Sequence, residues 1–456
     1  MIASPAFRGK LYAVLGLARS GLATVEALLA SGATVTAWDS REEARAALLA
    51  PPLQGRGWGG GVQQETSEQV ENPHPSPEGE RLSVADPLEI DLADFSGVVV
   101  SPGVPLNRHP IAAHARAAGV PVIGDIELFA QARAHLPPHK VVGITGTNGK
   151  STTTALIHHI VETAGVPALL GGNIGLPILG RDPLPEGGVY VLELSSYQID
   201  LTASLDCDVA VLLNITPDHL DRYEGFAGYA ASKARLFAMQ SPDHVAVIAV
   251  EDDASRAIAD GVRSRLVRVT ADQAGDQSGW PALQGPHNAQ NAAAAIAVAR
   301  ALGIGEAAIA RGLATYPGLP HRMERVATRG GVLFVNDSKA TNATSAAPAL
   351  AAYPAIHWIL GGKPKTDELD ACAPFYDHVR AAYTIGEAGP MFARLLRAAG
   401  KSVTESGTLE AAVRAAAAAA KPGEAVLLSP ACASFDQFAD YEARGAAFRA
   451  AVEALR

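Results

Sequence analysis

The segment that most constrains this chain is residues 143–154, which read Gly143-Ile144-Thr145-Gly146-Thr147-Asn148-Gly149-Lys150-Ser151-Thr152-Thr153-Thr154. The apolar pair Val141-Val142 precedes it as in a β-strand, and residues 155–161 follow it with helical spacing. A glycine-containing turn between a strand and a helix lets backbone N–H groups converge on a phosphate. The segment therefore predicts an ATP site, formed by Gly146, Thr147, Asn148, Gly149, Lys150, Ser151 and Thr152.

Two side chains of this loop, those of Lys150 and Ser151, are expected to contact ATP or its metal ion. Lys150 can reach the terminal phosphates of ATP, and the hydroxyl of Ser151 can join the coordination shell of Mg²⁺. The usual phosphate-loop pattern has a glycine at the position of Ile144. A glycine-rich turn that binds no ligand is therefore the structural alternative.

Length and composition narrow the class of protein. With 456 residues, 48% of them hydrophobic, the chain is long enough for about two to four globular domains. Its formal net charge of −10 argues against a nucleic-acid or acidic-membrane partner, because neither would meet a basic surface. The three cysteines are dispersed, and no apolar run reaches the roughly 18 residues of a membrane span. We expect a cytoplasmic protein without membrane insertion.

The first segment, residues 1–124, has the pattern of a Rossmann-like nucleotide-binding domain. Residues 11–15 predict a buried strand, which is followed by Gly16-Leu17-Ala18-Arg19-Ser20-Gly21 and a helical run. A second strand, residues 34–38, ends at Asp39, where a carboxylate could meet a ribose hydroxyl. Because such glycine patterns are common, a βαβ turn without a ligand is the alternative. Residues 51–83 are dense in Gly, Pro, Gln and Glu, and we interpret them as a long surface insertion.

Two further segments alternate strands with helices. Residues 125–318 contain the phosphate loop and predict a central ATP-binding domain with a mostly parallel sheet. Residues 319–456 predict a C-terminal domain with strands at 332–335, 357–360, 382–385 and 425–428. The predicted fold class is therefore α/β with three domains: N-terminal Rossmann-like, central P-loop-type and C-terminal Rossmann-like.

Outside the loop, several side chains are candidates for metal or phosphate chemistry. Glu193 leaves the end of a predicted strand and is the best carboxylate for Mg²⁺, although an exposed loop glutamate is the alternative. His219 lies between Asp218 and Asp221, where a histidine could also cap a helix. Lys233 by itself would be interpreted as a solvated helix lysine. Asp337 follows a strand and could bind a ligand or cap a helix, and Arg322 could reach a phosphate.

Taken together, these stretches resemble the Mur ligases of peptidoglycan synthesis. The shared motifs are residues 145–151, Gly172-Asn173-Ile174-Gly175, Glu193-Leu194-Ser195-Ser196, Asp218-His219-Leu220-Asp221-Arg222, His287-Asn288-Ala289-Gln290-Asn291 and Gly318-Leu319-Pro320-His321-Arg322. Residues 124–128, 336–342 and 428–438 resemble the member of the family that adds glutamate. The likeness spans all three segments and fails mainly in residues 51–83.

The resemblance implies an ATP-dependent amide ligase. ATP would phosphorylate the terminal carboxylate of UDP-N-acetylmuramoyl-L-alanine, and the amine of D-glutamate would attack the resulting acyl phosphate. By similarity to the family, Ser151 and Glu193 would hold one Mg²⁺ ion, and His219 would hold a second together with a carbamylated Lys233. Lys150 would stabilise charge on the phosphates. The remaining ATP contacts implied by the family are Asn288, Asn291, Arg322 and Asp337.

The resemblance also implies the contacts of both small-molecule substrates. The residues matching the uridine-nucleotide site are Arg19, Ser20, Asp39, Ser40, Arg41, Ser101, Pro102 and Gly103, and Asn173 and Ser195 match the muramoyl-alanine end. The residues matching the D-glutamate site are Lys339, Thr341, Lys365, Ser434 and Tyr441. Tyr441 departs from the phenylalanine common there, and either Lys363 or Lys365 could face the γ-carboxylate. We expect a monomer.

Three alternatives remain open from the sequence. One is another amide ligase of the same superfamily, adding a different amino acid or resembling a folylpolyglutamate synthetase, although residues 336–342 and 428–438 argue against it. Another is a nicotinamide-dependent oxidoreductase with two Rossmann-like segments, which would not need the phosphate loop. The last is a regulator that hydrolyses ATP without joining two substrates.

Overall fold

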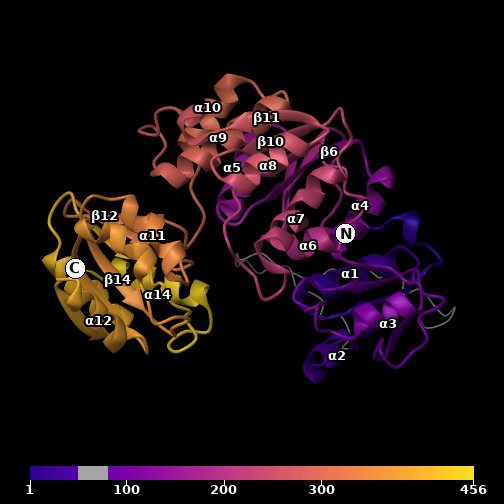
Figure 1. Cartoon of the computed structure of the whole chain (residues 1–456), viewed down its shortest axis with the longest axis horizontal. Helices are drawn as coiled ribbons and strands as arrows, with labels where there is room; N and C mark the ends of the chain where they lie inside the picture. Colours follow the sequence, from indigo (N-terminus) through magenta and orange to yellow (C-terminus); the bar gives the residue numbers. More distant parts are fainter. Residues whose placement is uncertain (50–80, 456) are drawn as a thin grey trace, which may run out of the picture. The chain divides into compact units, whose positions relative to one another are not determined.

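The computed structural model describes residues 1–49 and 81–455 (Figure 1). The described chain divides into two compact units: residues 1–147, 167–246 and 260–266 form one, and residues 148–166, 247–259 and 267–456 form the other. Most of the predicted insertion, residues 51–83, lies outside the described residues. Its predicted end is wrong, because Leu82–Val84 forms strand β3, which pairs in parallel with β2 from Leu82 beside Val35.

The first sheet has five parallel strands in the order β3-β2-β1-β4-β5. Its strands besides β3 are Leu11–Leu15 (β1), Thr34–Trp38 (β2), Gly97–Val100 (β4) and Val122–Ile123 (β5). Helices Arg19–Ala30 (α1), Glu42–Leu49 (α2) and Ile111–Ala117 (α3) alternate with them, and Asp125–Ala132 (α4) follows. The alternation is that of the predicted Rossmann-like domain. Every residue of β4 is buried, as expected for a strand inside a parallel sheet.

The second sheet has six strands in the order β11-β10-β9-β6-β8-β7. The strands are His139–Thr145 (β6), Ala168–Gly172 (β7), Gly188–Glu193 (β8), Val209–Leu212 (β9), Val245–Ala249 (β10) and Arg265–Val269 (β11). The helices are Lys150–Thr163 (α5), Ser196–Asp200 (α6), Gly225–Ala238 (α7), Asp253–Gly261 (α8), Pro286–Ala301 (α9) and Glu306–Thr315 (α10). Strand β6 pairs in parallel with β8 and β9, and β7 with β8. The central mostly parallel sheet predicted from the sequence is therefore present.

The third sheet also has six strands, in the order β12-β13-β17-β14-β15-β16. The strands are Glu324–Arg329 (β12), Val332–Asn336 (β13), Ile356–Gly361 (β14), Val379–Ile385 (β15), Val403–Gly407 (β16) and Ala425–Leu428 (β17). The helices are Ala343–Ala351 (α11), Gly389–Ala398 (α12), Leu409–Ala419 (α13) and Tyr441–Glu453 (α14). The edge strands β12 and β16 were not predicted, because their side chains are mostly half-buried or exposed and carry no apolar run.

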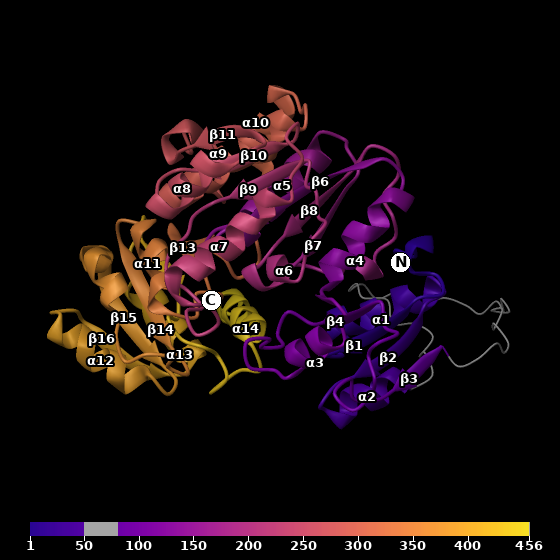
Figure 2. The same ribbon diagram turned by 45° about the vertical axis from the view of Figure 1, so that its right-hand side comes forward.

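Both faces of the third sheet are covered. Trp358 and Leu360 of β14 lie in one apolar cluster, whereas Ile359 lies in the other. Successive side chains of a strand point to opposite faces, so a strand in contact with two apolar clusters is buried on both sides. This is the layered arrangement of a Rossmann-like domain, and Figure 2 shows β14, β15 and β16 running side by side with α11, α12 and α13 near them.

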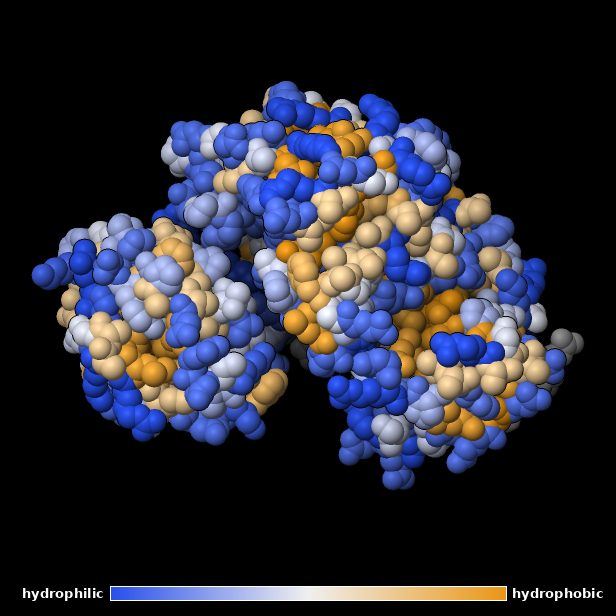
Figure 3. Space-filling model, in the orientation of Figure 1, coloured by the Kyte–Doolittle hydropathy of each residue, from blue (hydrophilic) through white to orange (hydrophobic). Residues whose placement is uncertain are grey.

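Short 3₁₀ helices complete the chain at Pro5–Phe7, Arg133–His135, Ile178–Gly180, Ala271–Ala274 and Asp370–His378. Hydrophilic residues cover much of the surface drawn in Figure 3. Within residues 1–49 and 81–455, no helix is long and apolar enough to cross a membrane.

Candidate active site

Three neighbouring strand ends surround the phosphate loop. Strand β6 leads into the loop and lies between β8 and β9 in the sheet. The register places Glu193 of β8 beside Ile144, and Leu212 of β9 beside Thr145. Because parallel strands end at the same edge of a sheet, the residues after β6, β8 and β9 gather at one edge, where α/β proteins bind their ligands.

The backbone of the loop depends on two glycines. Gly146 has a φ of 150°, and a Cβ there would lie 3.1 Å from the Cβ of Leu213 and 3.3 Å from the backbone N of Asn214. Gly149 has a φ of 83° and immediately precedes α5, a 14-residue helix without a side-chain cap at its N-terminus. A helix start of this form is suited to bind a phosphate. Lys150 and Ser151 are its first two residues, as the sequence predicted.

Glu193 is buried and has one carboxylate oxygen without a protein partner. Glu193 is 2% exposed. One oxygen, Oε1, accepts a hydrogen bond of 2.8 Å from Nδ2 of Asn173, and the other, Oε2, is buried without a hydrogen bond. An unpaired buried carboxylate oxygen is costly, and a divalent cation would satisfy it. The exposed loop glutamate considered from the sequence is therefore wrong, and the donor fits Mg²⁺.

Lys233 is almost completely buried, so the solvated lysine considered from the sequence is also wrong. The residue is 1% exposed. Its Nζ donates a hydrogen bond of 2.9 Å to the carbonyl oxygen of Gly146 and lies 4.6 Å from the ring centroid of Tyr229. Helix α7 thus brings the amine of Lys233 to the phosphate loop, next to a backbone carbonyl at the start of the loop.

His219 lies in the irregular segment between β9 and α7. Its side chain is 46% exposed, and its Nε2 is 3.6 Å from Oδ2 of Asp218. The backbone of His219 has a φ of 52°, which is uncommon for a residue with a side chain. Helix α7 begins at Gly225 with Glu224 before it, so His219 does not cap that helix. The segment meets the loop through Thr147, whose Oγ1 accepts from the backbone N of Thr216 at 3.0 Å.

Within residues 1–49 and 81–455, no group of three His, Cys, Asp or Glu side chains is placed to hold a metal ion. The predicted set of Ser151, Glu193, His219 and Lys233 contains only two residues of those types. An ion held by these residues would therefore need the serine hydroxyl, a modified lysine, phosphate oxygens or water as further ligands.

The residues predicted to contact ATP are tied to one another in pairs. The Nη2 of Arg322 donates to Oγ of Ser151 at 3.0 Å, which brings this arginine, from the segment between α10 and β12, to the start of α5. Asn291 accepts from Oγ1 of Thr153 at 3.1 Å and donates to Oδ1 of Asn288 at 3.1 Å. Asn291 therefore joins α9 to α5, and Asn288 orients the amide of Asn291.

Asp337 is buried at the end of β13. Its oxygens accept from the backbone N of Met323 at 3.2 Å and from Oγ of Ser429 at 2.8 Å. Burial raises the pKa of this carboxyl from 3.8 to about 7. Helix α11 is capped by Asn342, so the helix cap considered for Asp337 from the sequence is wrong.

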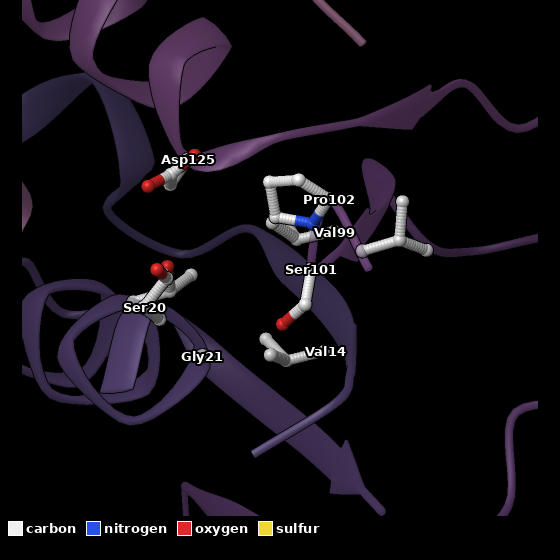
Figure 4. A pocket seen from close by; sticks show the side chains of 9 residues that line it. Val14, Ser20, Gly21, Val99, Ser101, Pro102 and Asp125 are labelled. Carbon is white, nitrogen blue, oxygen red and sulfur yellow. The ribbon is translucent and has the colours of Figure 1, made fainter. Parts of the chain in front are cut away.

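The first domain offers a small pocket at the ends of β1 and β4. Its lining includes Ser20, Ser101, Pro102 and Asp125 (Figure 4). The Oγ of Ser101 donates to the carbonyl oxygen of Gly16 at 3.0 Å. Asp125, which begins α4, is 5% exposed, and burial raises the pKa of its carboxyl from 3.8 to about 6. Ser20 and the Ser101-Pro102 pair, predicted to bind the nucleotide substrate, thus share one pocket.

Both carboxylate oxygens of Asp39 accept hydrogen bonds from groups of the protein. Its Oδ2 accepts from the backbone N of Leu17 at 2.7 Å, and its Oδ1 accepts from Nε of Arg41 at 3.1 Å. The side-chain hydrogen bond from Arg41 is the main cause that lowers the pKa of Asp39 to about 2. Asp39 therefore holds the first glycine turn through Leu17, and Arg41 holds Asp39. The other residues predicted around this nucleotide, Arg19, Ser40 and Gly103, are exposed.

The residues predicted for D-glutamate lie on the third domain. The Nζ of Lys339 is 3.7 Å from the ring centroid of Tyr441, and Nζ of Lys365 donates to Oγ1 of Thr341 at 3.4 Å. Ser434 is buried. Lys363 pairs with Ala433 through the backbone, and the side chain of Lys365 contacts Thr341, another predicted residue.

Arg444 joins these stretches and was not predicted. It is 1% exposed, and its guanidinium donates to the carbonyl oxygens of Ser338 at 2.8 Å and Cys432 at 3.1 Å. Burial lowers the pKa of Arg444 to about 10. Its position in the sequence, on a helix of ordinary composition, gives no signal of burial.

At the predicted muramoyl-alanine site, Ser195 forms a capping box with Gln198 at the start of α6.

Comparison with known families accounts for this arrangement. The Mur ligase middle domain matches residues 144–299, and the Mur ligase glutamate ligase domain matches residues 321–432. This chain belongs to the Mur ligase family. Membership of the Mur ligases implies the use of ATP and Mg²⁺.

Mur ligases of several bacteria are similar to the chain over its whole length. UDP-N-acetylmuramoylalanine–D-glutamate ligase of Novosphingobium aromaticivorans is 65% identical over 100% of this chain and 97% of its own length. The enzymes of the same name from Sphingopyxis alaskensis and Zymomonas mobilis are 63% and 60% identical, each over 100% of both chains.

Solved structures of other Mur ligases share the fold. A UDP-N-acetylmuramate-alanine ligase of Thermotoga maritima has a TM-score of 0.56 at 16% identity and covers 97% of this chain and 99% of its own. A D-alanyl-D-alanyl-adding ligase of Acinetobacter baumannii has a TM-score of 0.56 at 18% identity and covers 79% of this chain and 85% of its own. At these identities the likeness supports the three-domain α/β architecture alone.

Proposed function

We propose that this chain is the ATP-dependent ligase that joins D-glutamate to UDP-N-acetylmuramoyl-L-alanine in peptidoglycan precursor synthesis. The observation that carries the proposal is its full-length similarity, at 60% identity or more, to three enzymes with that name. The residues around the phosphate loop are consistent with this proposal, because the loop, Glu193 and Lys233 suit the binding of a nucleoside triphosphate and Mg²⁺.

The first chemical step of this proposal makes an acyl phosphate. A carboxylate oxygen of the alanyl end attacks the γ-phosphorus of ATP, the bond to the β-phosphate oxygen breaks, and ADP leaves. Phosphoryl transfer depends mainly on positioning and charge neutralisation. The helix start at Lys150 holds the phosphates, and the ammonium group of Lys150 neutralises their charge. Arg322, which donates to Ser151, adds a second cation next to the helix start.

The second step forms the amide. The unprotonated amine of D-glutamate attacks the acyl carbon to form the C–N bond, and the nitrogen loses one proton to water. The tetrahedral intermediate then expels phosphate as its C–O bond breaks. Lys339 and Lys365 supply two positive charges for a dicarboxylate, and the hydroxyls of Thr341 and Ser434 supply donors. Lys365 already contacts Thr341, so these two side chains are arranged to meet the same substrate group.

Magnesium would be held by Ser151, Glu193, His219 and Lys233, and its charge would lower the barrier to phosphoryl transfer. We propose two ions and a carbamylated Lys233. A neutral lysine amine reacts with CO₂ to give a carbamate and a proton, which converts a buried cation into a carboxylate-like ligand. The 1% exposure of Lys233 and its hydrogen bond to the carbonyl oxygen of Gly146 support this assignment, because a carbamate on that amine would lie beside the start of the phosphate loop.

A coupled assay of phosphate release tests the function. The purified chain is incubated with ATP, Mg²⁺, UDP-N-acetylmuramoyl-L-alanine and a panel of amino acids that includes D-glutamate and L-glutamate. Release that depends on D-glutamate supports the proposal. Preference for another amino acid would indicate another amide ligase of the superfamily, and equal release without any amino acid would indicate an ATPase.

The finer features of the proposal have separate tests. We propose domains at residues 1–124, 125–318 and 319–456, which limited proteolysis would examine. We also propose that the chain is a cytoplasmic monomer. Sedimentation at micromolar concentration measures the oligomeric state directly.

A further inference from the structure

The segment of residues 213–224, which carries His219, contains no helix or strand. The imidazole of His219 is half exposed, and its nearest carboxylate, on Asp218, is 3.6 Å away. Its backbone has a sparsely populated φ of 52°. The ring centroid of His219 lies 5.1 Å from that of Tyr197, and the same tyrosine ring is contacted by Arg222, so a neighbour in the turn takes part in placing the imidazole.

Arg222 makes the most extensive of these contacts. Its backbone N donates to the carbonyl oxygen of His219 at 2.9 Å, which closes the turn. Its Nη2 donates to the carbonyl oxygen of Val104 at 3.2 Å, and its Cζ lies 4.2 Å from the ring centroid of Tyr197. A planar guanidinium can stack on an aromatic ring and donate in its plane at the same time, which a lysine cannot do.

A second bond joins the same two segments. The Nδ2 of Asn107 donates to the carbonyl oxygen of Asp221 at 3.2 Å. Arg222 and Asn107 also line one pocket, together with Pro102 and Val104. The turn that carries His219 is thus fastened at two successive residues to the segment 104–107 of the first domain.

The segment 104–107 directly follows the residues assigned to the nucleotide substrate. The backbone N of Val104 donates to the carbonyl oxygen of Ser101 at 3.0 Å. Ser101 in turn donates to Gly16 in the first glycine turn. A continuous series of hydrogen bonds therefore leads from the first glycine turn through Ser101 and Val104 to Arg222 and His219.

We propose that Arg222 is a positioning residue that couples occupancy of the nucleotide-substrate loop to the placement of His219. The inference rests on the proposed function, which assigns residues 101–103 to the uridine nucleotide and His219 to Mg²⁺. A substrate that fixes Ser101-Pro102-Gly103 also fixes the carbonyl of Val104, and with it the guanidinium and the turn. Coupling between two sites is reciprocal, so Mg²⁺ with nucleotide must tighten the binding of the muramoyl substrate by the same factor.

Isothermal titration calorimetry of the full chain measures this factor. UDP-N-acetylmuramoyl-L-alanine is titrated without and with Mg²⁺ and a non-hydrolysable ATP analogue, and the ratio of the two dissociation constants is compared between variants. We expect the parent chain to bind about fivefold or more tightly in the presence of Mg²⁺ and the analogue. Arg222→Met should reduce the ratio to below about two, and Arg222→Lys should give an intermediate value.

A matched control is Arg108→Met, which removes a cation from the same part of the first domain. Arg108 is exposed, and its side chain makes none of the bonds that join the two segments. This variant should keep the parental ratio. The melting temperature of each variant, measured without ligand, shows that the fold is retained.

Two results would overturn the proposal: a parental ratio in Arg222→Met, or a ratio of one in the parent chain that binds the substrate. Failure of the parent chain to bind UDP-N-acetylmuramoyl-L-alanine at all would instead contradict the proposed function. A purely structural role for Arg222 would lower the melting temperature without changing the ratio, and would also overturn the proposal.

Discussion

The unpaired oxygen of Glu193 leads to a quantitative prediction for Glu193→Gln. In the parent chain Oε1 accepts from Asn173, whereas Oε2 is buried without a partner. Leaving a buried acceptor unpaired costs about 1–3 kcal/mol, and more when the group is charged. Glutamine keeps the acceptor for Asn173 and removes the charge. The variant without metal should therefore unfold at the same temperature as the parent chain or at a higher one.

The response to Mg²⁺ should change in the opposite direction. A ligand at 100 times its dissociation constant stabilises a folded protein by about 2.7 kcal/mol, and at its dissociation constant by about 0.4 kcal/mol. Loss of a metal ligand is expected to weaken Mg²⁺ binding at least about 100-fold. At that loss, Mg²⁺ would stabilise Glu193→Gln by about 2.3 kcal/mol less than it stabilises the parent chain. For a domain of about 200 residues this corresponds to about 5–9 °C in melting temperature.

Differential scanning calorimetry with and without Mg²⁺ and the ATP analogue is the assay. Glu127→Gln is the matched control, since Glu127 is equally buried but its Oε2 accepts from the backbone N of Ala203 and Ser204. That variant should lose stability and keep the full response to Mg²⁺. An undiminished Mg²⁺ response in Glu193→Gln would refute the assignment of Glu193 as a metal ligand.

Three further predictions follow from individual contacts. Lys233→Ala should lower ligase turnover by about 100-fold or more, and short carboxylates added to the assay should restore part of it if a carbamate has been lost; an unchanged rate would remove Lys233 from the site. Asp125→Asn should gain stability relative to the parent chain as pH rises through the range 4 to 6, because the folded pKa of Asp125 is raised from 3.8 to about 6 and its ionisation is therefore unfavourable in the folded state. The gain should approach at most about 3 kcal/mol above pH 6, and a difference in unfolding free energy that does not vary with pH would contradict it. Gly172→Ala should destabilise the chain and abolish the Mg²⁺ response in calorimetry, since a Cβ at Gly172 would lie 2.1 Å from the carbonyl oxygen of Glu193; a melting temperature and Mg²⁺ response equal to those of the parent chain would show that the two strands move apart freely.

The predicted elements that the structure reproduces are those with strong local signals. Strands such as 11–15 and 425–428 are short apolar runs bounded by polar or glycine turns, and both are present. Strands β3, β12 and β16 were missed because they lie at sheet edges, where a strand is not buried on both faces and need not be apolar. The end predicted for the insertion was wrong for the same reason.

The site residues differ in how far the sequence predicts their environment. The phosphate loop could be predicted, because a strand, two glycines and a helix start that follow one another in the chain suffice to form it. The burial of Lys233 is different: a lysine on a helix is usually solvated, and only the packing of α7 brings its amine to the carbonyl of Gly146. Arg444 likewise follows no local pattern, since its partners lie about 12 and 106 residues away along the chain.

The α/β class, the order of the three domains, the phosphate loop and the family could all be predicted from the sequence alone. These depend on patterns within a few residues, which set whether a strand, turn or helix forms. Three further properties became visible only in the folded chain: one oxygen of Glu193 stays unpaired, Asp125 and Asp337 are buried enough to raise their pKa values, and Arg222 bridges to Val104. These properties depend on which segments meet in space, and contacts between residues far apart in the chain are set by the packing of the whole domain.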